Sequence, residues 1–351
     1  MERSVFFIPP LEKAAGGIQA LVELVAVLAR QGRAVAVTSP LPDCRAMAGV
    51  GEAVPRLPWD ASGLGAFLSP RDLWCVPEGW PNAIAQGVNA GSRTLVYVQS
   101  WVFMLTALPE SVRWSSLPVR YLAVSHPVRW FLREVCGLES LAVLPPAVDP
   151  LFFASGGRPR NRLRVAWMPR KNKGLAGYIR QVALACLERE NLRVPVDFVE
   201  IHRMPRAAVA EILQTCHIFL STGFPEGFAL PPAEAMASGC VPVGFTGLGG
   251  LEYMRNQEDR KGLGLYYPPF VLPKKPWGPN GFFVADGDVV SAGRSLAHAL
   301  VLAHSCPQAW EALVRNARQT AAAYGTEERE QAAARIWSSL AGEMPSQEGR
   351  A

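Results

Sequence analysis

Residues 221–244 read STGFPEGFALPPAEAMASGCVPVG and combine a strand end, a glycine-containing loop, a helix and the start of another strand. Two carboxylates stand in this stretch, Glu226 before the tandem proline and Glu234 after it. Proline is tolerated in a first helical turn because its missing N–H would have no intrahelical partner there. We therefore expect a helix from Pro232, with Glu226 in the preceding loop and Glu234 in the first turn.

The loop between the two glutamates suits a ligand that carries both phosphate and hydroxyl groups. Gly227 permits close approach of a ligand to the backbone, and carboxylates accept hydrogen bonds from neighbouring sugar hydroxyls. A helix amino terminus and the N–H groups next to it favour an anion. These N–H groups belong to Phe228, Ala229 and Leu230. Taken singly, each glutamate also has a structural explanation, Glu234 as a helix-dipole or capping residue and Glu226 as a polar loop residue.

Outside this stretch, short β-branched and aromatic runs alternate with helix-length amphipathic segments, which is typical of parallel βαβ units. Before residue 154 the expected strands are 5–8, 34–38, 73–76, 94–99, 120–125 and 142–144, and the clearest helix is 18–30. After the polar stretch 154–162 the expected strands are 163–168, 196–201, 217–221, 241–245 and 282–285, with helices at 175–189 and 207–215.

This pattern predicts an α/β protein with two Rossmann-like, doubly wound parallel sheets joined near residue 155. The expected domains are 1–153 and 154–326, followed by a segment, 327–351, whose helix would pack back across the linker on Ala332, Ile336 and Leu340. Residues 255–280 break the alternation and are interpreted as an insertion, because long connections without regular structure are uncommon in compact domains.

Composition narrows the class of protein. A chain of 351 residues is long for one core. Seven scattered cysteines without a C-x-x-C motif fit a reducing cytoplasm. The amino terminus has four consecutive apolar residues before its prolines, whereas a membrane helix needs roughly 20. The net charge of +5 suits anionic small molecules or an anionic membrane surface as readily as nucleic acid.

The string E-G-F-x-L-P-x-x-E-A-M-A-x-G-x-x-P-V, from Glu226 to Val243, resembles the donor-site signature of the family 4 glycosyltransferases, retaining enzymes of GT-B fold. In that fold two Rossmann-like domains face a central cleft, and the resemblance covers most of the chain. It implies that Glu226 contacts hydroxyls of the transferred sugar and that Glu234 holds the ribose of the nucleotide. Ala229 stands where glycine or serine is more usual, a departure that would narrow the sugar pocket.

Two further motifs match positions that the family uses for the donor diphosphate. Gly16 and Gly17 open the first expected helix, although a plain turn would also explain them. They lack a full G-x-G-x-x-G, which weighs against an NAD enzyme. In the second domain, Arg170 and Lys173 resemble the family's arginine and its lysine before glycine, with a shorter spacing than usual. Lys171 is an alternative partner of Arg170, ranked below Lys173, and a solvated charge run is the simpler explanation of the cluster.

The remaining candidates concern the base and the acceptor. His202 and Arg203 stand where the family cradles the base, although a surface histidine is the simpler interpretation. Gln99 and Ser100 replace the family's histidine after the fourth strand, similar to some bacterial rhamnosyltransferase-like members. His126 is a nearby alternative, weighed evenly against a helix cap formed by Ser125 and His126 before Pro127.

The sequence therefore predicts a cytoplasmic, metal-independent, retaining glycosyltransferase without a cofactor. It would move a hexose or deoxyhexose from a nucleotide diphosphate sugar to a glycan or lipid-linked acceptor in cell-surface polysaccharide synthesis. No nucleic acid partner is expected. Trp101, Trp114 and Trp130 allow a peripheral contact with the inner face of the cell membrane, with burial as the alternative. The rival functions are a catalytically silent nucleotide-sugar or glycan-binding relative, a GT-B epimerase or phosphorylase, and an NAD oxidoreductase.

Overall fold

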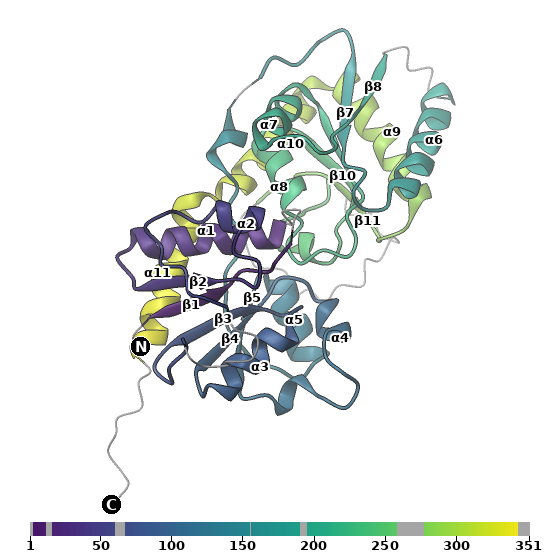
Figure 1. Ribbon diagram of the computed structural model, residues 1–351. Helices are drawn as coiled ribbons and strands as arrows, with labels where there is room; N and C mark the ends of the chain where they lie inside the picture. Colours follow the sequence, from purple (N-terminus) through teal and green to yellow (C-terminus); the bar gives the residue numbers. More distant parts are fainter. Residues whose placement is uncertain are drawn as a thin grey trace, which may run out of the picture. The chain divides into compact units, whose positions relative to one another are not determined.

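The computed structural model describes residues 3–11, 16–59, 67–154, 156–189, 195–257 and 277–342 (Figure 1). The chain separates into two compact units. Unit 1 comprises Met1–Pro146 and Glu327–Ala351, and unit 2 comprises Ala147–Thr326. The terminal segment from Glu327 is therefore grouped with the amino-terminal unit.

Unit 1 is built on a six-stranded parallel sheet with the order β2-β1-β3-β4-β5-β6. Its strands are β1 Ser4–Phe7, β2 Val35–Thr38, β3 Leu73–Pro77, β4 Arg93–Val98, β5 Val119–Ala123 and β6 Ser140–Val143. Its helices are α1 Gly16–Arg30, α2 Arg45–Ala48, α3 Pro81–Asn89, α4 Phe103–Thr106, α5 His126–Glu134, the 3-10 turn Trp114–Ser116 and, at the carboxyl end of the chain, α11 Thr326–Gly342. The six strands expected from the sequence are confirmed, each end lying within two residues of the prediction.

Helix α11 is held on unit 1 by a stripe that differs from the predicted one. The buried positions are Arg329, Ala333, Trp337 and Leu340, of which the prediction contained Leu340. The indole N–H of Trp337 donates to Oγ of Ser4 over 3.0 Å, and its ring stacks on Phe6. The prediction missed these positions because it followed the small and aliphatic residues, whereas the helix turns its largest aromatic side chain toward the sheet.

Unit 2 is built on a five-stranded parallel sheet with the order β11-β10-β9-β7-β8. Its strands are β7 Leu163–Trp167, β8 Val196–Glu200, β9 Ile218–Ser221, β10 Val241–Phe245 and β11 Phe282–Val284. Its helices are α6 Lys173–Arg189, α7 Arg206–Thr215, α8 Leu230–Ala237, α9 Val289–Ser305 and α10 Pro307–Ala322, with 3-10 turns at Pro150–Phe153 and Gly249–Glu252. All five predicted strands are confirmed.

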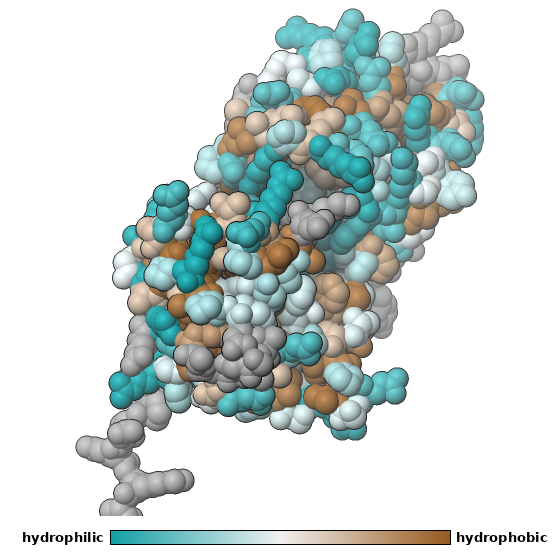
Figure 2. Space-filling model, viewed as in Figure 1, coloured by the Kyte–Doolittle hydropathy of each residue, from teal (hydrophilic) through white to brown (hydrophobic). Residues whose placement is uncertain are grey.

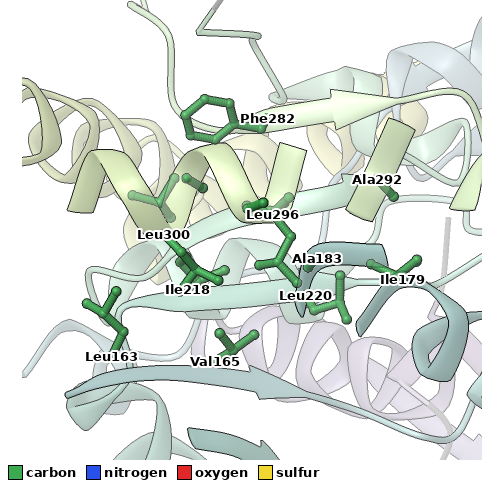
Figure 3. Close-up of a cluster of buried hydrophobic side chains, with 14 of the residues drawn as sticks. Leu163, Val165, Ile179, Ala183, Ile218, Leu220, Phe282, Ala292, Leu296 and Leu300 are labelled. Atoms are coloured by element: carbon green, nitrogen blue, oxygen red, sulfur yellow. The ribbon is translucent and has the colours of Figure 1, made fainter. Parts of the chain in front are cut away.

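The core of unit 2 explains why its strands β9 and β10 are buried along their whole length. Leu296 and Leu300 of α9 and Ile179 of α6 pack on Ile218 and Leu220 of β9 (Figure 3). Helices α7, α8 and α10 lie on the opposite side of the sheet (Figure 1). A parallel sheet covered by helices on both faces is buried on both faces, so its strands lack the alternation of a half-exposed sheet.

In each sheet the chain reverses its direction of winding once. Unit 1 winds from β1 to β2 and then returns to place β3 on the other side of β1. Unit 2 winds from β7 to β8 and then returns to place β9 on the other side of β7. In open α/β sheets the loops diverge at such a point, leaving a crevice at the carboxyl ends of the two strands where ligands bind. The topology thus predicts ligand-binding sites at the loops after β1 and β3 and at those after β7 and β9.

The expected insertion 255–280 lies mostly outside the described residues. Its two ends are close together, since Arg255 N donates to Oδ1 of Asn280 over 2.9 Å and Asn256 forms a β-bridge with Gly281. The side-chain amide of Asn280 donates to Tyr253 O over 2.8 Å. The described residues at its two ends therefore lie at one place in unit 2.

The predicted membrane contact receives no support from the tryptophans. Trp114 is buried and its indole donates to Met104 O over 2.8 Å, while Trp101 and Trp130 are half-buried. Hydrophobic and hydrophilic residues are interspersed on the visible face of the molecule (Figure 2). None of the helices in the described ranges combines the length and apolar character that a membrane crossing requires.

Candidate functional site

The loop after β9 in unit 2 is fixed in place by the loop after β10. Glu226 N donates to Gly247 O over 2.9 Å, and Gly249 N donates to Glu226 O over 3.1 Å. Gly247 has a φ of +66°, and a Cβ there would meet Cβ of Glu226 at 2.8 Å, so a side chain is excluded for conformational and steric reasons. The backbone of Glu226 is therefore held on both sides.

Asp286 secures the loop after β10 in turn. Its Oδ1 accepts hydrogen bonds from Thr246 N over 3.0 Å and from Gly247 N over 2.9 Å. Burial raises the pKa of the Asp286 carboxyl, and the backbone N–H groups oppose this rise. The contact links the end of β11 to the loop that holds Glu226.

The loop after β7 is joined to the same place through side chains. The ammonium of Lys171 lies 2.9 Å from Oε1 of Glu226 and donates to Pro225 O over 2.5 Å. The amide of Asn172 donates to Thr222 O over 2.8 Å and to Phe224 O over 3.1 Å. The loops after β7 and β9, at the point where the strand order reverses, thus form one connected structure.

A pocket opens at this structure and contains four of the residues predicted from sequence. Arg170, Lys171, Glu226 and Ala229 all line it. The other lining residues are Met168, Phe219, Leu220, Ser221, Thr222, Gly223, Pro231 and Pro232. One arginine, one lysine and one glutamate therefore line the same small cavity at the carboxyl ends of β7 and β9.

The predicted preference for Lys173 over Lys171 does not match their placement. Lys173 begins α6, its side chain is 68% exposed, and its ammonium lies 3.9 Å from Oε2 of Glu200. Lys173 does not belong to the described residues that line the pocket. Asn172, between the two lysines, has a left-handed φ of 56°, which turns the backbone sharply at this point.

The start of α8 differs from the expected start at Pro232. The helix begins at Leu230, with the prolines in its first turn, and follows Ala229 in the left-handed conformation with φ 62° and ψ 59°. This conformation costs a non-glycine residue roughly 1–2 kcal/mol. The side chain of Phe228 is buried, with its ring 5.3 Å from that of Tyr253 and 5.2 Å from that of Tyr324.

Because α8 begins early, Glu234 lies in its second turn rather than its first. Glu234 is 8% exposed, and its Oε1 lies 3.1 Å from Nη2 of Arg206. Glu234, like Lys173, is absent from the set of described residues that line the pocket. The pKa of Tyr253 is raised well above its usual value, mainly by burial and further by the charges of Glu226 and Glu234.

The two predicted base-binding residues stand apart from the pocket. His202 and Arg203 are exposed in the segment between β8 and α7, and Arg203 has a φ of 52°. This segment follows β8, the edge strand next to β7. Their predicted contact with a nucleotide base stays a prediction.

In unit 1 the predicted residues converge on a glutamate that the sequence analysis did not identify. The side-chain amide of Gln99 donates to Gly17 O over 2.9 Å, and a Cβ on Gly17 would lie 2.3 Å from Oε1 of Gln99. Glu78, directly after β3, accepts hydrogen bonds from Gln99 N over 3.0 Å and from Ser100 N over 2.7 Å. The α1 start, with Gly16 exposed and Gly17 partly buried, thus meets the ends of β3 and β4.

The environment of Glu78 changes its acidity. The residue is 2% exposed, and burial raises the pKa of its carboxyl to about 7 against the opposing effect of the backbone N–H groups. The available sequence signal was a single acidic residue directly after the strand run LWCVP. A single acidic residue after a strand does not show that its carboxyl group accepts hydrogen bonds from the end of the neighbouring strand.

For His126 the structure shows the helix cap and leaves the acceptor role untested. Ser125 is the N-cap of α5, and its Oγ accepts a hydrogen bond from Val128 N over 3.2 Å. His126 is the first residue of the helix and is half-buried. Among the described residues of both units, no group of three or more His, Cys, Asp or Glu side chains is arranged to hold a metal ion.

Two parallel α/β units of six and five strands, each with a switch in strand order, have the fold of GT-B glycosyltransferases. The chain is similar to sucrose-phosphate synthase from Thermosynechococcus elongatus, with 14% identity, a TM-score of 0.66, and coverage of 97% of this chain and 100% of that one. It is also similar to the pneumococcal O-GlcNAc transferase GtfA in complex with UDP and GlcNAc, with 10% identity, a TM-score of 0.63, and coverage of 97% and 99%.

Other comparisons give a similar fold and a partial sequence match. The lipopolysaccharide outer core galactosyltransferase WaaB aligns with 10% identity, a TM-score of 0.60, and coverage of 96% of this chain and 99% of that one. In sequence, the chain is 27% identical over 128 residues to an alpha-1,6-glucosyltransferase of Actinobacillus pleuropneumoniae serotype 7, a match that spans 36% of this chain and 38% of that protein. No protein-family model matches the chain.

Proposed function

We propose that this protein is a glycosyltransferase that moves a sugar from a nucleotide diphosphate donor to a glycan or lipid-linked acceptor. The observation that carries the proposal is the pocket of unit 2 that Arg170, Lys171 and Glu226 line together, with Lys171 paired to Glu226. The partial match to a glucosyltransferase and the GT-B fold support it. A neighbour of the same fold described with UDP and GlcNAc supports the donor class.

Each charged group of the pocket has a role in this proposal. Departure of a nucleoside diphosphate places negative charge on the leaving oxygen, which a positioned arginine and ammonium stabilise. Arg170 and Lys171 supply that charge, and Lys173 takes second place because its ammonium lies toward Glu200. Glu226 accepts hydrogen bonds from hydroxyls of the transferred sugar.

The finer parts of the proposal concern stereochemistry, metal and acceptor. Transfer retains the anomeric configuration, with attack on the face of the sugar that the diphosphate leaves and a donor phosphate oxygen accepting the proton of the acceptor hydroxyl. The positive charge comes from side chains rather than a divalent ion. The donor sugar is a hexose or deoxyhexose, and the acceptor, on the side of Gln99, Ser100 and His126, belongs to cell-surface polysaccharide synthesis.

A two-stage experiment tests the proposal. Thermal shifts of the purified protein with UDP-, GDP-, ADP- and dTDP-sugars identify the donor, because a bound ligand raises the unfolding temperature by mass action. Release of nucleoside diphosphate is then followed with that donor and a panel of glycan and lipid-linked acceptors, with and without EDTA. NMR of the product gives the anomeric configuration. A protein that no nucleotide sugar stabilises contradicts the proposal.

The alternative, a catalytically silent binding protein, gives a different result in the same experiment. It would show the thermal shift with a donor but no release of nucleoside diphosphate with any acceptor. The Glu226→Gln variant separates the two functions further. In an enzyme it abolishes turnover while the thermal shift with free nucleoside diphosphate persists.

A further inference from the structure

Glu234 is held by a charged network that reaches the beginning of unit 2. Nη2 of Arg206 lies 3.1 Å from Oε1 of Glu234, and Nη1 of the same guanidinium lies 3.4 Å from Oδ2 of Asp149. The guanidinium also lies over the ring of Phe152, 5.5 Å from its centre. One arginine thus connects the segment before β7, the start of α7 and the second turn of α8.

The geometry fixes Glu234 more firmly than a surface ion pair would. The side chain of Glu234 is 11% exposed and that of Arg206 is 30% exposed. A glutamate side chain has several rotatable bonds, and ordering it on ligand binding costs affinity. Because Arg206 is itself held by Asp149 and Phe152, it can fix the carboxylate before a ligand arrives.

The position of Glu234 on α8 connects this network to the pocket. Pro231 lines the pocket and lies three residues before Glu234, so the two residues share one side of the helix. Arg206 is the first residue of α7 and follows the segment with His202 and Arg203. The network therefore lies about one helical turn along α8 from the pocket-lining Pro231.

We infer that Arg206 is a positioning residue that orients the carboxylate of Glu234 to accept hydrogen bonds from the ribose hydroxyls of the donor. The inference rests on the proposed function, because it requires a nucleotide in this pocket. Arg206 itself does not contact the ribose in this arrangement. Asp149 acts indirectly, by holding the guanidinium of Arg206 in place.

The test measures how strongly the protein distinguishes ribose from a sugar without those hydroxyls. Calorimetry gives the affinity for whichever of ADP, GDP and UDP binds most tightly, and for its 2′,3′-dideoxy counterpart. We expect the wild type to prefer the ribonucleotide by on the order of tenfold or more, since the dideoxy form leaves the carboxylate without hydroxyl partners. Glu234→Gln and Arg206→Met should each remove most of this preference, and Arg206→Lys should keep part of it.

A matched control is the exposed pair of Arg162 and Asp197 in the same unit, whose atoms lie 3.2 Å apart. Arg162→Met removes an arginine–carboxylate contact of similar length and should leave the ribose preference unchanged. Asp149→Asn covers the case in which Arg206→Met does not fold. It keeps an oxygen for the hydrogen bond from Leu151 N but removes the charge facing Arg206, and a reduced preference is expected.

The outcomes separate the inference from the proposed function. If the wild type binds none of the three ribonucleotides, the inference about the ribose is overturned, and the proposed function fails as well only if dTDP is not bound either. If the wild type prefers the ribonucleotide and Glu234→Gln removes that preference, but the folded Arg206 and Asp149 variants keep it at the wild-type level, the positioning role of Arg206 is overturned. A loss of preference in Arg162→Met would equally count against it.

Discussion

Lys171 and Glu226 form an ion pair, 2.9 Å between Nζ and Oε1, that joins the loops after β7 and β9 at the point where the strand order of unit 2 reverses. Both side chains are largely buried, with 32% and 19% exposed. Each group of the pair compensates the charge of the other. In the proposed reaction the donor enters next to this pair, with its diphosphate toward the cation and its sugar toward the carboxylate.

Lys171 and Lys173 should differ in their effect on turnover. We expect Lys171→Met to lower kcat/KM by on the order of 10²-fold or more, as removal of a charge that stabilises the leaving group does. Lys173→Met removes an equal charge from an exposed position two residues away and should cost less than tenfold. Steady-state release of nucleoside diphosphate measures both variants. A larger loss in Lys173→Met would assign the diphosphate to Lys173 instead.

Glu226→Gln and Arg170→Ala should leave the fold intact while abolishing transfer. The backbone of residue 226 is held by Gly247 and Gly249, and neither contact involves its side chain. Arg170 is exposed, so its truncation opens no cavity in the core. Circular dichroism and unfolding temperature report the fold, and product formation reports the reaction. Unchanged turnover in either variant would remove that residue from the proposed site.

The sequence was sufficient for the sheets and for the placement of part of the candidate site, because both depend on local signals. A buried parallel strand is a continuous apolar run, and Glu226 and Ala229 belong to one contiguous motif. The placement of Lys171 and Lys173 was not readable, because it depends on the left-handed turn at Asn172. The pair of Glu234 and Arg206 joins residues 28 positions apart on different helices, a contact for which no spacing rule exists.

Glu78 should make unit 1 less stable as the pH rises from about 4.5 to about 7. The pKa of its carboxyl in the folded protein is about 7, against 4.5 without the environment of the fold. The folded state therefore binds the proton more tightly, and stability is lost as that proton leaves with rising pH. The shift corresponds to about 3 kcal/mol.

The measurement for Glu78 is the unfolding temperature between pH 4.5 and pH 7.5, for the wild type and for Glu78→Gln. The neutral amide cannot ionise, so the difference between the two proteins should grow in favour of the variant as the pH rises. A difference that is independent of pH in this range would show that the buried carboxyl is not the titrating group. Gln99→Ala is a suitable control, because it leaves Glu78 and the two backbone N–H groups in place.

His217 should have the opposite effect in unit 2. Its Nδ1 accepts a hydrogen bond from Arg164 N over 3.2 Å, and burial, followed by the charges of Arg158 and Arg164, lowers its pKa from 6.5 to about 4. Because the folded state disfavours the proton, the stabilisation is fully present above pH 6.5 and is lost as the pH falls toward 4. After allowance for its partial exposure, we expect this contribution to be about 2 kcal/mol.

His217→Asn, which keeps an acceptor but has no titratable group, should lose less stability than the wild type between pH 6.5 and pH 4, measured by urea unfolding at each pH. Parallel loss in both proteins would mean that another group, rather than this histidine, sets the acid sensitivity of unit 2.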